Sequence, residues 1–370
     1  MLKGYTNYKR VYETLKKEIL GGKYSSGKSF PSSTALARRF EIARFTIRQA
    51  LDILAMEGLI RSQRGRGTFV TKMGANRQIG LIVPGVAYSE FFQPIVTALS
   101  GMCVERGYGL SIGSVFSENG EERARQAMAL AHDLVEKRVS GVILQPIESI
   151  PNAPRVNKQI LSVFKEVGIP VVMIDSDVVP LPLRSEYDVV GINNFDAGRR
   201  MAIHLLAAGA RRICFVSTPW SCYGIRDRFA GVQSVLASHG VLIRSMFELN
   251  ASKADEVRRL MRKERPDAIL CSCDTFAAHL KCTLEKIGKR VPEDVLLAGF
   301  DDVQHATIMT PALTTVRQPC AEIAREAFCA LIDRIKGENR PAREILLNAS
   351  LVVRASTRRV RDVTKKGRGR

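Results

Sequence analysis

Charged residues stand where strand-like runs end, in a pattern suited to binding a polyhydroxylated molecule. Asp175 follows the apolar run VVMI, Asp274 follows AILCSC, and Asp301 follows LLAGF. Arg228 lies in YGIRDRFAG, near the start of an expected helix. In open α/β sheets the carboxyl ends of strands form the ligand crevice. Carboxylates there accept hydrogen bonds from paired sugar hydroxyls and a guanidinium donates to the same groups, although Asp274 alone would equally suit a helix N-cap.

Aromatic side chains near these positions add an apolar surface. Phe91, Phe92, Trp220 and Phe276 are placed to stack on the apolar face of a sugar ring. A Phe pair in a helix fits a hydrophobic core as well. It is the grouping on one rim, rather than any single member, that predicts a binding site.

Sequence motifs for catalysis and cofactor binding are missing. No G-x-G-x-x-G follows a strand, and the chain has no Walker-type phosphate loop, G-x-S-x-G or H-E-x-x-H. The five histidines are unclustered, and the eight scattered cysteines fit free buried thiols better than a disulfide framework or a zinc site. We therefore expect a binding protein rather than an enzyme, with no cofactor and no metal ion.

The polar positions need a sheet that brings distant strand ends together. Near-continuous apolar runs alternate with amphipathic helical segments, which is typical of a parallel sheet covered on both faces. The expected strands are 79–84, 108–116, 140–145, 169–175, 188–192, 211–217, 267–272 and 295–301. This many strands exceed one sheet, so two Rossmann-like lobes are expected.

The first seventy residues have a different pattern. Helical spacing of apolar residues predicts a helix over 8–20, a second helix after the N-cap Ser32, and a third from about Phe45 to Met56. Two short β-like runs, GLIRS and GTFVT, follow and are joined by QRGR. This order of elements predicts a winged helix-turn-helix, whose third helix enters the major groove of DNA.

The third helix has one apolar and one polar face. Ile47, Ala50, Leu51 and Leu54 form a buried stripe, and the opposite face carries Phe45, Arg48, Gln49 and Asp52. Arginines at 44 and 48 share a side and suit guanine edges or phosphates. Phe45 either meets an apolar group such as a thymine methyl or folds back onto the second helix.

The tract RGRG at 64–67 admits three interpretations: a phosphate loop, a disordered Arg/Gly tract, or a hairpin tip. It lies between two β-like runs and occurs once, so we interpret it as the wing. Gly65 and Gly67 permit a tight turn. Arg64 and Arg66 are then placed to reach phosphate or the minor groove.

The net charge of +19 is concentrated at the two ends of the chain. Residues 1–77 hold 16 Lys/Arg against 5 Asp/Glu, and residues 358–370 hold 7 against 1. A nearly neutral body with a basic N-terminal unit indicates a polyanionic partner. The C-terminal run is either a solvated disordered tail or a nonspecific DNA contact. Because no apolar signal or membrane-spanning run is evident, we expect a cytoplasmic protein without membrane contact.

Residues 7–72 resemble the GntR-type winged helix. The matching stretches are FPSSTALARRF, ARFTIRQALDILAMEGLI and RGRGTFV. Two positions depart from the family pattern: Ser33-Thr34 replaces the usual Glu-Arg, and Ala43 replaces a Ser. The residue pattern and this resemblance together predict DNA contacts at Ser32, Thr34, Arg44, Phe45, Thr46, Arg48, Gln49, Arg64, Gly65, Arg66 and Gly67.

Residues 79–357 resemble the LacI/GalR-type ligand-binding domain, akin to periplasmic sugar-binding proteins. The marks are IGLIVP, VGINNFDAGRRMAIHLLAAGARRICFVS and VPEDVLLAGFDDVQHATIMTPALTTVRQP. Asn193-Asn194 replaces a usual Asp-Asn, and Cys273 replaces an Asn that commonly bonds the ligand. The predicted effector residues are Phe91, Phe92, Asp175, Trp220, Arg228, Cys273, Asp274, Asp301 and Gln318.

The sequence therefore predicts an α/β protein with an N-terminal winged helix-turn-helix and a two-lobed, Rossmann-like, periplasmic-binding-protein-like domain. Expected boundaries are 1–72 for the head, 73–78 for a linker, 79–357 for the body and 358–370 for the tail. We expect a homodimeric repressor of carbohydrate-metabolism genes that binds a pseudo-palindromic operator and a sugar-like effector. The alternatives are a solute receptor without a gene-regulatory role and a DNA-binding head fused to an enzyme.

Overall fold

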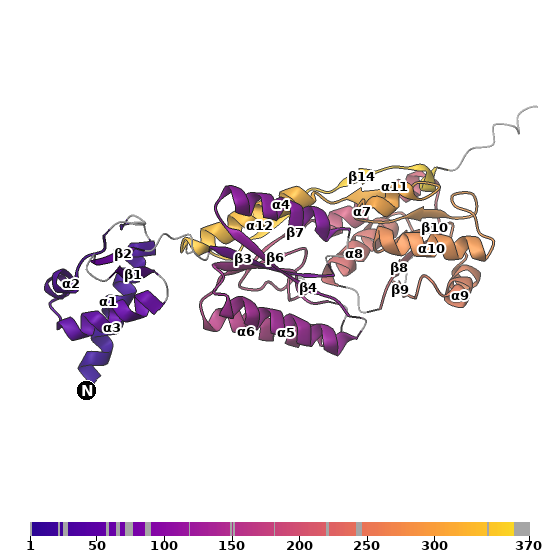
Figure 1. Cartoon of the computed structure of the whole chain (residues 1–370). Coiled ribbons are helices and arrows are strands. Elements are labelled where there is room, and N and C mark those ends of the chain that lie inside the picture. Colours follow the sequence, from indigo (N-terminus) through magenta and orange to yellow (C-terminus); the bar gives the residue numbers. More distant parts are fainter. Residues whose placement is uncertain are drawn as a thin grey trace, which may run out of the picture.

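The protein consists of a small head and a larger two-lobed body in the computed structural model (Figure 1). The structure describes all residues except 1, 21–22, 25–28, 57–58, 64–66, 71–76, 86–89, 118, 149, 151, 181, 220–221, 242–245, 339 and 359–370. For residues 2–7, 20, 56, 61 and 63 only the backbone is described. No helix of the described chain is both long and apolar enough to cross a membrane.

The head is a three-helix unit followed by a hairpin. Its elements are α1 (Leu2–Leu20), α2 (Ser33–Phe40), α3 (Arg44–Met56), β1 (Ile60–Gln63) and β2 (Gly67–Val70). The predicted stripe of α3 is buried and packs against α1, because Ile47, Ala50 and Leu54 join Val11 and Leu15 in one core. The two strands pair antiparallel. The winged helix-turn-helix is thus confirmed, with α1 beginning earlier than the expected residue 8.

The first lobe of the body is a six-stranded parallel sheet in the order β13-β7-β6-β5-β3-β4. Its strands are β3 (Gln78–Pro84), β4 (Gly109–Val115), β5 (Gly141–Leu144), β6 (Val171–Ile174), β7 (Asp188–Ile192) and β13 (Glu344–Leu347). Helices α4 (Phe92–Glu105) and α12 (Cys320–Ile335) cover one face, and α5 (Gly120–Glu136) and α6 (Ala153–Glu166) cover the other (Figure 1). Both faces are buried, which explains the near-continuous apolar runs.

The second lobe repeats this architecture around a smaller parallel sheet, in the order β11-β10-β8-β9. Its strands are β8 (Ile213–Ser217), β9 (Phe247–Glu248), β10 (Ala268–Cys271) and β11 (Leu296–Ala298). Its helices are α7 (Asn194–Ala207), α8 (Tyr223–Ser238), α9 (Ala254–Glu264), α10 (Asp274–Lys286) and α11 (Gln304–Ile308). Along β8, Phe215 packs toward α7 and α8 while Val216 packs toward α9 and α10. The expected two-lobed α/β fold is confirmed.

The chain passes between the lobes three times. The crossings follow β7 at 192–194, β12 (Thr315–Arg317) at 317–320, and β13 at 347–350. After the last crossing, β14 (Ser350–Val352) pairs antiparallel with β12, and the helical turn η1 (Ala355–Thr357) ends the described body. The crossings lie together, since β12 pairs with β14 and the backbone N–H of Asn193 donates to the carbonyl oxygen of Leu347 at 3.4 Å.

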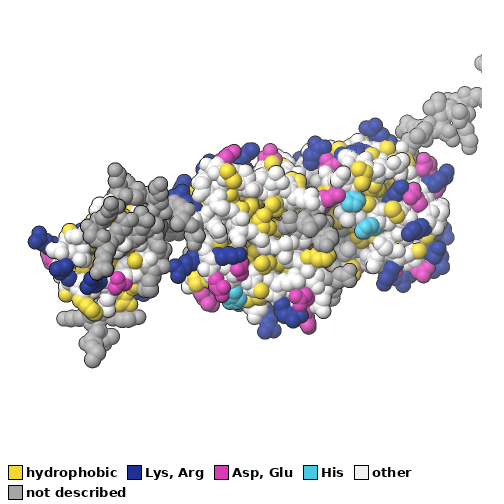
Figure 2. All heavy atoms as spheres, viewed as in Figure 1, with side chains coloured by type: hydrophobic (Ala, Val, Ile, Leu, Met, Phe, Trp, Pro, Cys, Tyr) yellow, Lys and Arg dark blue, Asp and Glu magenta, His cyan; other side chains and the backbone are white. Residues whose placement is uncertain are grey.

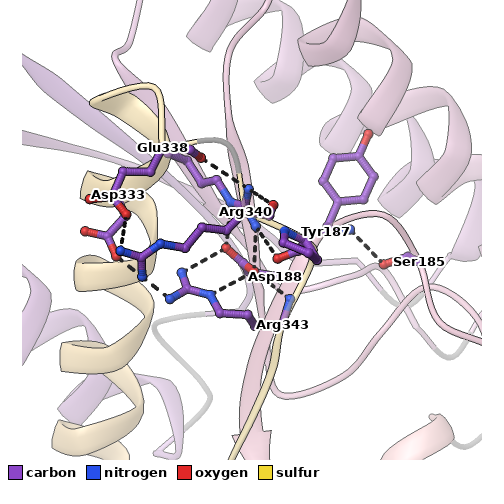
Figure 3. A network of polar contacts seen from close by, with 9 residues as sticks. Ser185, Tyr187, Asp188, Asp333, Glu338, Arg340 and Arg343 are labelled. Carbon is purple, nitrogen blue, oxygen red and sulfur yellow. Dashed lines mark hydrogen bonds and ion pairs between the residues drawn. The ribbon is translucent and has the colours of Figure 1, made fainter. Parts of the chain in front are cut away.

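A buried carboxylate joins three elements of the first lobe that lead into or out of the crossings (Figure 3). Asp188, at the start of β7, accepts from Arg334 of α12 at 2.8 and 3.0 Å and from the backbone N–H of Arg343 at 2.7 Å. Burial opposes its ionisation, but the hydrogen bonds from Arg334 and Arg343 outweigh it and lower the pKa of Asp188 to about 2. One side chain therefore links β7, α12 and the segment leading into β13.

Candidate functional sites in the head and between the lobes

The outward face of α3 carries most of the residues predicted to contact DNA. Phe45 is 72% exposed, so its ring does not fold back onto α2. Arg44, Arg48 and Gln49 are exposed beside it, and Thr46 is half-buried. Two arginines one helical turn apart, with a solvent-facing phenyl ring between them, suit a groove that presents phosphates, guanine edges and thymine methyls.

The start of α2 has the capping predicted from sequence. The Ser32 hydroxyl oxygen accepts from the backbone N–H of Ala35 at 3.2 Å, so Ser32 is the N-cap, and Thr34 is exposed in the first turn. The backbone N–H of Phe30 donates to the carbonyl oxygen of Thr68 at 2.7 Å. The segment entering α2 is therefore attached to the hairpin, and both flank α3.

The hairpin supports the interpretation of RGRG as a wing. Gly67 opens β2 with φ of 100°, a conformation that L side chains rarely adopt. The predicted contacts Arg64, Gly65 and Arg66 lie outside the described residues. Figure 2 shows basic and acidic side chains on the described part of the head as well as on the body.

Arg228 forms the centre of the crevice between the lobes. Its side chain is 5% exposed, and its Nε donates to Asn194 Oδ1 at 2.7 Å while Nη1 donates to the carbonyl oxygen of Ser272 at 2.9 Å. The guanidinium lies over the Phe300 ring, 4.8 Å from its centroid, and Nη1 is 3.6 Å from Asp301 Oδ1. These contacts hold a fixed positive charge against a carboxylate, as the sequence predicts.

Asp301 and Gln318 form a wall of the crevice beside Arg228. Gln318 Nε2 donates to Asp301 Oδ1 at 2.8 Å. Gln318 is only 5% exposed, and its Oε1 has no hydrogen-bond partner among the described residues. Burial raises the pKa of Asp301, while the charge of Arg228 and the bond from Gln318 oppose that rise.

Asp175 faces this wall from the first lobe. Burial raises its pKa, Arg228 lowers it and Asp301 raises it further, so all three charges act on one another across the crevice. Asp175 has φ of 70° and Asp301 has φ of 108°. Left-handed backbone at a non-glycine residue costs about 1–3 kcal/mol and is concentrated at binding sites.

Sequence reasoning missed Glu148, which lies beside Asp175. Gln145 Nε2 is 3.2 Å from Glu148 Oε2 and 3.4 Å from Asp175 Oδ2, and the Ser176 hydroxyl donates to Glu148 Oε1. Burial, and then the charge of Asp175, raise the pKa of Glu148 to about 7. Both Gln145 and Glu148 follow the end of β5, so the strand-end rule that singled out Asp175 would have found them.

Asp274 lies beneath the crevice rather than in it. It is fully buried, and its oxygens accept from Thr315 Oγ1 at 2.7 Å and from the backbone N–H of Val303 at 3.2 Å. Burial, and then the charge of Asp301, raise its pKa to about 8. The contacts of Asp274 hold the loop that carries Asp301.

The remaining predicted effector residues divide between the cavity and the core. Phe91 lines a cavity of about 800 Å³ together with Asp301 and Gln318. Phe92 contacts the Phe91 ring edge-on but is itself packed in the first-lobe core. Cys273 is half-buried, and Trp220 lies outside the described residues. The cavity is of the size that holds a small ligand.

Thiols at the crevice are poor nucleophiles. Burial raises the pKa of Cys273 and of Cys320 to about 12, and it raises that of Cys222 well above its usual value. The nucleophile is the thiolate, which these pKa values disfavour at neutral pH. Across the described chain, no three His, Cys, Asp or Glu side chains are grouped to hold a metal ion.

Two known families match separate stretches of this chain, one in the head and one in the later part of the body. Residues 7–70 match the bacterial regulatory proteins of the gntR family, and residues 202–357 match the periplasmic binding protein-like domain.

Relatives are similar over most of their length. The arabinose metabolism transcriptional repressor of Geobacillus stearothermophilus is 27% identical over 368 residues, which cover 94% of this chain and 98% of that protein. The HTH-type transcriptional repressor PurR of Pectobacterium carotovorum is 28% identical over 293 residues, covering 77% of this chain and 81% of the relative. A crystal structure of the transcription regulator GntR from Chromobacterium violaceum is 26% identical with a TM-score of 0.62, covering 76% of this chain and 99% of that one. The chain therefore combines a gntR-type DNA-binding domain with a periplasmic binding protein-like domain, and its relatives are transcriptional repressors of the LacI/GalR/PurR type.

Proposed function

We propose that the protein is a transcriptional repressor of carbohydrate-metabolism genes whose operator affinity is set by a sugar-like effector bound between the lobes. The observation that carries this proposal is the buried pair of Arg228 and Asp301, of which Asp301 lines a cavity of about 800 Å³, in a chain whose head exposes arginines on α3. A guanidinium and a carboxylate side by side donate to and accept from two neighbouring hydroxyl groups.

The head binds the operator through α3 and the wing. Arg44 and Arg48 contact phosphates or guanine edges, Phe45 contacts a thymine methyl, and the tip at 64–67 reaches phosphate or the minor groove. The domain boundaries predicted from sequence are retained: the head extends to residue 72, and the body begins near residue 79, where the structure starts β3 at Gln78.

The effector closes the lobes by bonding to both of them at once. Asp175 belongs to the first lobe, whereas Arg228 and Asp301 belong to the second. A ligand that contacts residues of both lobes favours the arrangement in which the lobes are closed about the three crossings. A coupling of about 1–3 kcal/mol between effector and operator would change DNA affinity about 5- to 150-fold. In this mechanism Asp274 and Phe92 are positioning residues, because they hold the Asp301 loop and Phe91.

The body forms a homodimer that places two heads on a pseudo-palindromic operator. Strand β4 is the outer strand of the first-lobe sheet, and Ile112 on it is 47% exposed. Val104, at the end of the neighbouring α4, is 74% exposed. An open sheet edge with apolar side chains beside it is a surface that a second copy would cover.

The rival functions lack support from particular residues. A receptor without a regulatory role has no use for exposed arginines and a phenyl ring on α3. An enzyme that uses a thiolate nucleophile is disfavoured, because burial raises the pKa of the crevice thiols Cys273 and Cys320 to about 12. We therefore propose a non-catalytic protein that acts at the chromosome, in the cytoplasm.

The experiment that tests this function selects an operator from random duplex DNA and measures binding by fluorescence anisotropy, with and without a panel of sugars. We expect a pseudo-palindromic site, and a sugar that both stabilises the protein against heat and shifts the anisotropy midpoint. Either direction of shift is compatible with effector control. Selection of no sequence, or a stabilising sugar that leaves DNA affinity unchanged, would contradict the proposal.

A further inference from the structure

The crevice holds more negative charge than a neutral sugar requires. Asp175 and Glu148 approach it from the first lobe and Asp301 from the second, and Arg228 is the cation whose charge reaches Asp175 and Asp301. Three carboxyl groups therefore meet one guanidinium among the described residues at this place.

Glu148 and Asp175 share donors that are too few for two ionised groups. The Gln145 amide lies between them, 3.2 Å from one carboxylate and 3.4 Å from the other, and the Ser176 hydroxyl serves the second oxygen of Glu148. A hydrogen bond from the Cys222 thiol also reaches Glu148, and all three donors are uncharged. Burial and mutual repulsion raise the pKa of Glu148 to about 7, which is the consequence of a carboxylate pair without a cation of its own.

Arg228 does not supply that cation to Glu148. Its Nε is bonded to Asn194 and its Nη1 to Ser272, and Nη1 is also the atom nearest to Asp301. The largest influences on the pKa of Glu148 are burial and the charge of Asp175, which raise it against hydrogen bonds from Ser176, Gln145 and Cys222. Arg228 thus acts on Asp175, while Glu148 has no bonded cation among the described residues.

A second, independent feature calls for a donor beside Asp301. Gln318 lines the cavity and is nine-tenths buried. Its Nε2 donates to Asp301, and its acceptor Oε1 has no hydrogen-bond partner among the described residues. Leaving a buried acceptor without a partner costs about 1–3 kcal/mol. A ligand hydroxyl or N–H next to Asp301 removes that cost.

We infer that the effector is an amine-bearing polyol of the amino-sugar class, whose ammonium group binds Glu148 and Asp175 while its hydroxyls bind Arg228, Asp301 and Gln318. This inference rests on the proposed function and narrows its ligand class. Glu148 then determines specificity, since it is the carboxylate added to the residues that a neutral sugar uses. An ammonium in this position gains charge-assisted hydrogen bonds, which exceed neutral ones in strength.

The test compares charged and neutral ligands of matched shape on the full chain at pH 7. The probes are D-glucosamine, D-galactosamine, D-mannosamine and the aminoalditol D-glucamine, each against its parent hexose or D-sorbitol, with the N-acetylated hexosamines as uncharged controls. Calorimetric titration should give at least about tenfold tighter binding for one amine than for its parent and its N-acetyl form, as expected for one hydrogen bond to a charged group.

Variants assign the preference to Glu148. Glu148→Gln keeps the size and the hydrogen-bonding capacity but removes the charge, so it should weaken amine binding about 10- to 100-fold and change binding of the neutral parent by less than about threefold. Glu166→Gln is the matched control, because Glu166 belongs to the same lobe, at the end of α6, and is exposed to solvent. It should leave both affinities unchanged.

The outcomes separate this inference from the proposed function. A neutral sugar that binds as tightly as its amine, or an amine preference that survives Glu148→Gln, overturns the inference and leaves the sugar-controlled repressor intact. Binding by neither group of probes overturns both. The comparison of ligands on the wild-type chain decides the matter even if Glu148→Gln does not fold.

Discussion

Replacing Arg228 by methionine should abolish the response to effector while leaving the head able to bind DNA. Methionine keeps an unbranched apolar stem over the Phe300 ring but removes the guanidinium that bonds Asn194 and Ser272 and faces Asp301. The change therefore isolates the charge and its hydrogen bonds from the packing of α8.

The expected losses of effector affinity and of folding stability follow from the groups that the guanidinium contacts. Two charge-assisted bonds to effector hydroxyls, at about 1.5–3 kcal/mol each, would be lost, so the dissociation constant should rise at least about 100-fold. Leaving Asp301 buried without its cation should also cost about 3 kcal/mol of folding stability, near the lower limit for breaking a buried pair, because protonation of Asp301 relieves part of the cost. A loss of that size lowers the unfolding midpoint by about 6–12 °C in a domain of this size.

The assay pairs anisotropy on operator DNA with calorimetry on the effector and thermal unfolding. Arg226→Met is the matched control, since Arg226 lies on the same helix but is exposed. It should change none of the three measurements. A folded Arg228→Met protein whose DNA affinity still responds to effector at the wild-type midpoint would refute the assignment of Arg228 to the effector site. Loss of DNA binding without effector would refute the separation of head from crevice.

Further outcomes concern the head and the stability of the body. Arg48→Ala should weaken operator binding by about 1–3 kcal/mol in an anisotropy titration while calorimetric effector affinity stays unchanged, and loss of effector binding as well would contradict the assignment. Operator affinity should fall linearly on a plot of log K against log salt, and Arg44→Ala should reduce the slope by about 1 if Arg44 neutralises a phosphate; a flat plot would contradict the electrostatic account. Because the pKa of Asp188 is lowered to about 2 in the folded protein, its contribution to folding stability is present above about pH 4 and is lost as pH falls toward 2. In urea unfolding at pH 7, Asp188→Asn should therefore lower the free energy of unfolding by at least about 2 kcal/mol. The difference in unfolding free energy from wild type should narrow below pH 4, and a difference that stays constant with pH would show that the carboxylate charge is irrelevant.

Helices with one buried apolar face, and strands in which every residue is buried, were predictable from sequence. Strand β7 was expected at 188–192 and lies there, because its residues are buried on both sides and no polar residue interrupts the run. The buried stripe and exposed face of α3 follow equally directly from residue spacing. Strands β9, β12, β13 and β14 were not predicted. They have two to four residues each and pair with segments far away in sequence, so local periodicity carries no sign of them.

The position of the candidate site at the strand ends was predictable from sequence, but how deeply each of its side chains is buried was not. Asp274 and Asp301 both follow apolar strands, yet one is fully buried and the other faces the cavity. The difference lies in the loop between β11 and α11, which folds over Asp274 and bonds to it through Val303. A β-carbon at Gly299 would lie 2.3 Å from an Asp274 oxygen, so the close approach requires a glycine there. Such packing depends on residues distant in sequence, and spacing alone does not reveal it.

The same reasoning explains why Glu148 matters for specificity. Asp175, Arg228, Asp301 and Gln318 can be named from a family resemblance, and residues found in that way describe what the chain shares with its relatives. Glu148 became visible only when the structure placed it beside Asp175, with one amide between two carboxylates. Whether a sugar or an amino sugar controls the repressor therefore depends on the residue that the resemblance does not name, and replacing that carboxylate by its amide is the smallest change that separates the two.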